Sequence, residues 1–116
     1  MRNIASALQA FFRGFGADAY GKNNVPQAAR MPYITYETGA PCGDEPLELR
    51  AWLWCRGPGR DAAAALVDAV RASLDEGGAA LPGAVILPGA PFAVEEPGAA
   101  GDVLCVTMRL QVLAEG

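Results

Sequence analysis

Histidine is absent from this chain of 116 residues, and lysine occurs once, at Lys22. Without histidine, a serine or cysteine nucleophile has no imidazole to serve as its base, so histidine-dependent triads are excluded. The nine basic residues form no cluster along the sequence, and the net charge is −4. A surface that wraps double-stranded DNA needs several cations together, so this chain does not look like a DNA-binding domain.

Cysteine is also scarce, with Cys42, Cys55 and Cys105 as its only occurrences. An odd number without Cys-x-x-Cys spacing resembles neither a disulfide framework nor a usual zinc site. Cys55 and Cys105 stand in apolar strand patterns, which predicts small core residues. No signal peptide is recognisable, and no apolar run approaches the roughly 18 residues that a membrane span needs. We therefore predict a protein made in a reducing cytoplasm, without catalytic residues, metal or cofactor.

Two segments show the apolar periodicity of amphipathic helices. The first covers about 4–13 and ends at Gly14, and the second covers about 60–75, is rich in alanine and ends at Gly77. The apolar stripe of the first helix is expected in the core, with a partner-binding helix as the alternative. Residues 16–31 between this helix and the next element are expected to form a long irregular segment, which is often functional.

Several segments alternate as β-strands do, and 47–56 is the clearest of them. One of its faces is apolar, while the other carries Trp52 and Trp54 between charged ends. Further strands are expected at 33–38, 84–87, around 92–95 and at 102–114, with turns at 39–46 and 96–101. The order predicts a single α+β domain over 1–116, with an antiparallel sheet of about four strands and both helices packed on one face.

The two tryptophans allow two interpretations. Two large apolar side chains on an otherwise polar face can form an exposed patch that marks an interface. Alternatively, a neighbouring strand or loop of the same chain covers them. The sequence does not decide between these interpretations.

The segments Asn24-Val25-Pro26 and Pro32-Tyr33-Ile34-Thr35-Tyr36 stand between the first helix and the main strand. Together with Leu53-Trp54 and Gly89-Ala90-Pro91-Phe92-Ala93 before the closing strand, they give the chain its most specific pattern. In these motifs and in its order of elements the chain resembles the small tail terminator, or tail completion, proteins of long-tailed bacteriophages. The family has no catalytic residues to transfer.

The resemblance implies a virion protein, assembled in the cytoplasm of a host bacterium, whose copies form a homo-hexameric ring. Such a ring caps the head-proximal end of the tail tube, stops its polymerisation and docks to the head connector, while DNA passes through without specific binding. The expected partners are further copies of the chain, the major tail tube protein and the connector or stopper. The expected interface residues are Arg50, Trp52, Trp54, Arg109, Tyr20, Lys22, Asn23 and Asn24. The alternatives are another neck component, such as a stopper or head-tail adaptor, and a small cytosolic protein-binding domain.

Overall fold

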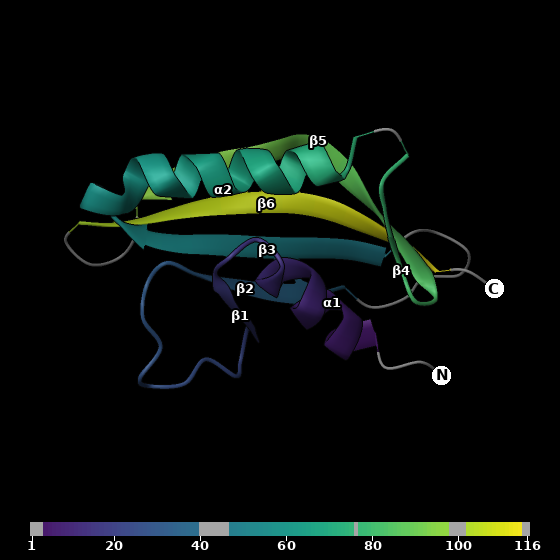
Figure 1. Ribbon diagram of the computed structural model, residues 1–116, viewed down its shortest axis with the longest axis horizontal. Helices are drawn as coiled ribbons and strands as arrows, with labels where there is room; N and C mark the ends of the chain where they lie inside the picture. Colours follow the sequence, from purple (N-terminus) through teal and green to yellow (C-terminus); the bar gives the residue numbers. More distant parts are fainter. Residues whose placement is uncertain (1–3, 40–46, 76, 98–101, 115–116) are drawn as a thin grey trace.

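The computed structural model describes residues 4–39, 47–75, 77–97 and 102–114. Two α-helices, a short 3-10 helix and six strands follow one another along the chain (Figure 1). Their bounds are α1 Ile4–Arg13, β1 Asp18–Gly21, β2 Tyr33–Thr38, β3 Leu47–Arg56, η1 Gly57–Gly59, α2 Arg60–Ser73, β4 Ala79–Leu81, β5 Ala84–Pro97 and β6 Val103–Ala114. Cys42, most of the turn expected at 39–46 and most of the turn expected at 96–101 lie outside the described residues.

The sheet has six strands in the order β1-β2-β3-β6-β5-β4 and is curled like half a barrel. β1 runs parallel to β2, whereas the other neighbouring pairs are antiparallel. The prediction of an antiparallel sheet of about four strands with two helices packed on one face is therefore wrong. It failed because two short edge strands, β1 and β4, went unrecognised and because β1 introduces a parallel pair.

β3 and β6 form the centre of the sheet, and their alternation fixes which side faces the core. Leu49, Ala51 and Leu53 of β3 are fully buried, while the residues between them are exposed or half-buried. Successive side chains of a strand point to opposite faces, so the hydrophobic pattern sets the orientation of β3. Residues opposite one another in the register share a face, which places Met108 and Leu110 of β6 on the same side.

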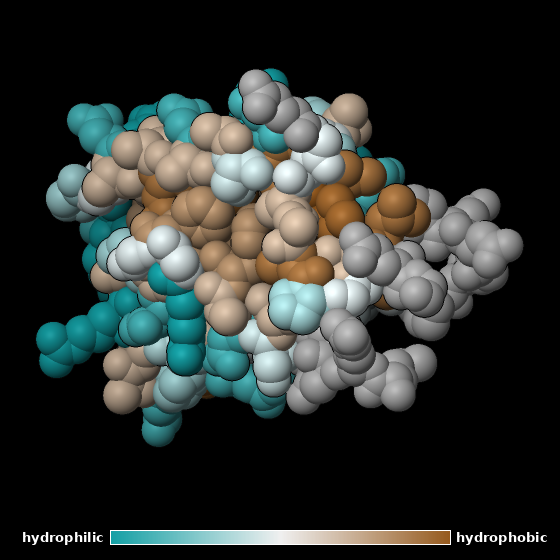
Figure 2. Space-filling model, turned by 45° about the vertical axis from the view of Figure 1, so that its right-hand side comes forward, coloured by the Kyte–Doolittle hydropathy of each residue, from teal (hydrophilic) through white to brown (hydrophobic). Residues whose placement is uncertain are grey.

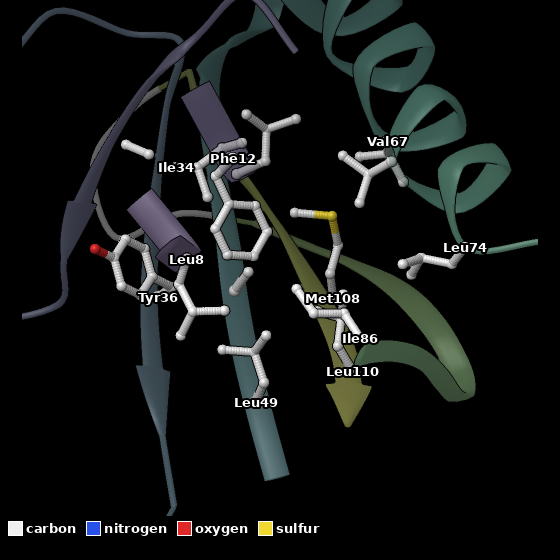
Figure 3. Close-up of a cluster of buried hydrophobic side chains, with 14 of the residues drawn as sticks. Leu8, Phe12, Ile34, Tyr36, Leu49, Val67, Leu74, Ile86, Met108 and Leu110 are labelled. Atoms are coloured by element: carbon white, nitrogen blue, oxygen red, sulfur yellow. The ribbon is translucent and has the colours of Figure 1, made fainter. Parts of the chain in front are cut away.

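Both helices contribute to the buried cluster on this side of the sheet (Figure 3). Leu8 and Phe12 of α1 point toward β2 and β3, and the ring of Phe12 stacks on that of Tyr36 at 5.5 Å between centroids. Val67 of α2 lies over Met108, which is fully buried. The opposite side of the sheet carries neither helix.

Apolar residues also extend across the surface of the helix-bearing side. Figure 2 shows them in the middle of the view, with hydrophilic residues around them. Phe11, Leu66 and Leu81 are among the partly buried apolar side chains that pack against the core. Within the described part of the chain, no helix is long and apolar enough to cross a membrane.

β1 lies in the segment 16–31, which was expected to be irregular throughout. Asp18–Gly21 instead pairs with the start of β2, and the Lys22 N–H extends the ladder by donating to the Tyr36 carbonyl at 2.9 Å. Two carbonyl groups on the outer edge of β1 accept hydrogen bonds from other residues of the same chain. The Gln9 side chain donates to the Ala19 carbonyl at 3.1 Å, and the Asn24 N–H donates to the Gly21 carbonyl at 2.9 Å.

β5 joins the two extended pieces that the sequence suggested at 84–87 and 92–95. Its pairing with β6 is interrupted only between Pro88 and Ala93, where the register shifts. Gly89 lies in this irregularity, and a Cβ there would come within 2.9 Å of the Arg109 carbonyl oxygen. Since β4 pairs with β5 only at 84–86, the prolines of β5 displace no ladder hydrogen bond to β4.

Candidate functional site

The side of the sheet that faces away from both helices, here called the open face, is the candidate site. Its members follow from the strand registers, because residues opposite one another point to the same side. The central ones are Tyr20, Tyr33, Thr35, Arg50, Trp52, Trp54 and Arg109.

Aromatic side chains occupy one part of the open face. Trp54 lies opposite Tyr33, and Trp52 lies opposite Thr35. The Tyr33 ring contacts the Tyr20 ring edge-on, with 6.0 Å between their centroids. The four aromatic residues are each half-buried, so they cover one another only in part. Such large amphipathic side chains are the ones that dominate protein interfaces.

Thr35 is the polar centre of this aromatic group. It is the one buried polar residue in the described part of the chain, with 5% of its surface exposed. The Trp54 indole N–H donates to the Thr35 hydroxyl oxygen at 3.0 Å. This bond fixes the orientation of the Trp54 ring and satisfies a hydroxyl group that would otherwise be costly to bury.

A row of charged residues crosses the open face beside the aromatic group. Glu37 lies opposite Arg50, and Arg50 lies opposite Arg109. Lys22 is 3.6 Å from a Glu37 carboxylate oxygen, and its Nζ is 5.1 Å from the centroid of the Trp52 ring. This distance is suitable for a cation–π contact.

The Arg50–Arg109 pair places two like charges directly across two strands, an arrangement that costs stability. Arg50 is partly compensated, since its Nε lies 2.7 Å from a Glu48 carboxylate oxygen. Arg109 is exposed and belongs to none of the ion pairs found among the described residues. The open face therefore presents one uncompensated guanidinium at its centre, next to aromatic surface.

The fold brings together six of the eight residues predicted for an interface: Tyr20, Lys22, Arg50, Trp52, Trp54 and Arg109. The remaining two lie in the turn after β1, where Asn23 and Asn24 are exposed. Asn24 borders a shallow cleft of about 240 Å³, which Ser6, Gln9, Tyr20, Gly21 and Tyr36 also line.

Tyr33 and Thr35 belong to the open face but were not among the predicted interface residues. The alternation of β2 indicates that they share a face, because Ile34 and Tyr36 between and after them are buried on the core side. What the sequence could not show is that Thr35 accepts a hydrogen bond from Trp54, which is 19 positions away.

Cys55 and Cys105 are both buried and free, but only Cys55 belongs to the core cluster, so the prediction of a small core residue is confirmed for Cys55 alone. They lie on adjacent strands but on opposite faces, because Cys105 is opposite Trp54 in the register and Cys55 is opposite Leu104. Burial, together with the nearby Glu96, raises the pKa of the Cys105 thiol to about 11. Burial also raises the pKa of Cys55. Neither thiol has the depressed pKa of a reactive cysteine.

In the described ranges, no group of three or more cysteine, aspartate or glutamate residues could hold a metal ion. Searches of protein-family models and of curated proteins find no match to the sequence. The resemblance to tail terminator proteins therefore remains a prediction. The open face is the feature of the described structure that is best suited to interaction.

Proposed function

We propose that this chain is a structural protein of a long-tailed bacteriophage, a tail terminator. In this role, copies of the chain form a ring that caps the head-proximal end of the tail tube. The ring stops tube polymerisation and joins the tail to the head connector. The observation that carries the proposal is the open face, an aromatic and charged sheet surface on a small domain whose two helices both lie on the other side.

The composition of the open face favours contact with protein. Half-exposed tryptophan and tyrosine beside an exposed arginine is the combination enriched at interface centres. Val94 and Leu113, the large apolar residues with the greatest exposure in the described structure, also point to this side, at 41% and 43%. Burying these side chains against another subunit would remove apolar surface from water and stabilise the assembly.

The charges are consistent with a ring that surrounds DNA without gripping it. Lys22 and Arg50 each lie near a carboxylate, and the whole chain has a net charge of −4. Non-specific DNA binding depends on several cations that are free to contact phosphates. The phage DNA would thus pass an assembly of this chain without strong attachment.

The proposal is tested with the major tail tube protein of a long-tailed phage, chosen from the genome that encodes this chain. Tube protein is allowed to polymerise with and without the purified protein, and tube lengths and ends are measured by negative-stain microscopy. We expect tubes that stop growing and carry a ring at one end. Rings that bind the connector but leave tube growth unchanged would indicate a stopper or adaptor. A protein that stays monomeric with tube protein present would contradict the proposal.

A pair of double variants tests the role of the open face. Replacing both Trp52 and Trp54 by serine removes the aromatic surface and should abolish rings. Replacing both by phenylalanine keeps apolar rings on the same side and should preserve assembly, which makes it the matched control. Circular dichroism shows whether each variant remains folded. Loss of folding in the serine variant would mean that the tryptophans stabilise the subunit itself.

A further inference from the structure

We propose that the open face binds α2 of a second copy of this chain. This inference rests on the proposed ring and names the contact that builds it. The occupant is the outermost ridge of α2, which consists of Asp61, Ala65, Asp68, Ala72 and Asp75, the last of which lies just past the end of the helix.

The ridge lies on the far side of α2 from the core. Ala63, Val67 and Val70 are buried against the sheet. At 100° per residue, the four ridge residues within the helix point about 150° away from this buried stripe, and the whole ridge, Asp75 included, is exposed. The spacing of three and four residues makes them neighbours along one line of the helix surface. Carboxylates and methyl groups thus alternate on the part of α2 that projects furthest into solvent.

The size of the ridge side chains suits the open face. Ala65 and Ala72 leave the backbone of α2 close to the surface, so a flat aromatic partner can approach it closely. The open face supplies such partners in Trp52 and Trp54, which are half-exposed.

The charges of the two surfaces are complementary. Arg109 lacks an ion pair within the described structure and has Arg50 directly opposite, so a carboxylate placed between them would relieve their repulsion. The ridge offers Asp61 and Asp68, which lie about 10 Å apart along the helix. Neither of these carboxylates forms an ion pair with another described residue. Asp68 is the central one, and we pair it with Arg109.

The two surfaces lie on opposite sides of the sheet, because α2 packs on its core side and the open face is its other side (Figure 3). A subunit cannot bring them together within itself, and a two-fold dimer cannot use both contacts at once. The contact is therefore head-to-tail, and each subunit uses one surface for each neighbour. Such contacts close into a ring when the rotation between subunits permits it.

The contact is tested by exchanging its charges. Arg109→Glu and Asp68→Lys are made separately and together, and native mass spectrometry measures assembly. Each single variant should raise the dissociation constant of the ring at least tenfold, and the double variant should restore it to within about threefold. Arg30→Glu, in the loop between β1 and β2, makes the same charge change elsewhere and should leave assembly unchanged.

The variants also separate folding from assembly. Glutamate at position 109 would lie opposite Arg50 and form a favourable cross-strand pair, so Arg109→Glu should unfold no more easily than the wild type. A steric test uses Ala65→Trp on the ridge, which should block assembly. Ala10→Trp, on the exposed side of α1, is its matched control.

Three results would overturn the contact. If Asp68→Lys and Ala65→Trp both form normal rings that still cap the tube, the inference is wrong while the proposed function stands. If the wild-type chain forms no ring even with tube protein, the proposed function fails and the inference fails with it. Loss of rings in both single charge variants without recovery in the double variant would also count against this pairing.

Discussion

Replacing Trp54 by phenylalanine should destabilise the protein chiefly through one hydrogen bond. The indole N–H of Trp54 donates to the hydroxyl oxygen of Thr35 at 3.0 Å, and Thr35 is only 5% exposed. Phenylalanine keeps an aromatic ring at the position but leaves the buried hydroxyl group without this donor. An unsatisfied buried polar group costs roughly 1–3 kcal/mol, so we expect a loss of about 2 kcal/mol in the free energy of unfolding.

A double-mutant cycle isolates the bond from the loss of ring area. Thr35→Val is combined with Trp54→Phe, which replaces both partners by apolar groups and should recover part of the loss. We expect a coupling energy of about 1 kcal/mol between the two positions. Trp52→Phe is the control, because no hydrogen bond from the Trp52 indole is found among the described residues.

Urea unfolding followed by tryptophan fluorescence measures each variant. The measurements are made at two protein concentrations tenfold apart, because assembly would make the apparent stability depend on concentration. A coupling energy below about 0.3 kcal/mol would refute the reasoning, since independent positions are additive within that limit. Equal losses in Trp54→Phe and Trp52→Phe would also show that ring area, and not the bond, determines the effect.

Two further perturbations test the fold. Gly78→Ala should lower the free energy of unfolding by more than 1 kcal/mol in urea titrations, because Gly78 has a φ of +91° and a Cβ there would collide with the Ile86 carbonyl oxygen; unchanged stability would contradict this. Cys105 should resist alkylation at pH 8 until the protein unfolds. Its folded pKa of about 11 exceeds the ordinary 9.0, so its contribution to stability should be complete below pH 9 and decrease between pH 9 and 11. Fast labelling of the folded protein, or stability rising across that interval, would contradict this.

The elements with strong periodicity could be predicted from the sequence. The alternation over 47–56 gives the bounds of β3, and helices at 4–13 and about 60–75 correspond to α1 and α2. In each of these segments the local hydrophobic pattern agrees with the tertiary environment. That agreement is the condition under which a pattern is informative.

The short edge strands could not be predicted in this way. Asp18–Gly21 is too short to show an alternation, and its pairing depends on β2, from which eleven intervening residues separate it. Ala79–Leu81 is shorter still and follows a glycine pair. Each strand is set by the neighbour it pairs with, and this information is absent from the local sequence.

The prolines of β5 misled the prediction for a different reason. Pro88 and Pro91 suggested a break between two pieces, because proline removes a ladder hydrogen bond in the interior of a sheet. Here they occupy a stretch where β4 has already ended, so no bond to β4 is lost. The position of a strand in the sheet decides whether proline is tolerated, and strand order is a property of the whole fold.

The interface residues, like the strands, could be predicted where the local pattern was informative and not where strand pairing decided their position. The strand alternation placed Trp52, Trp54 and Arg50 on one face of β3. It could not show that Lys22 lies over the Trp52 ring, since that contact requires β1 to pair with β2. Asn23 and Asn24 were predicted as part of a long loop that reaches a neighbour, and they lie in the turn after β1, where Asn24 borders the cleft that Ser6 and Gln9 of α1 also line.

The edges of the sheet have a consequence for the free subunit. On β1, Gln9 and Asn24 occupy the carbonyls of Ala19 and Gly21, and β4 is only three residues long. Unprotected edge strands are templates on which identical chains stack into fibres. Occupied carbonyls, short edge strands and prolines are devices that discourage such stacking. At β1 and β4 the fold therefore disfavours edge-to-edge stacking of free subunits, which leaves the faces of the sheet, and not these two edges, for contacts between copies.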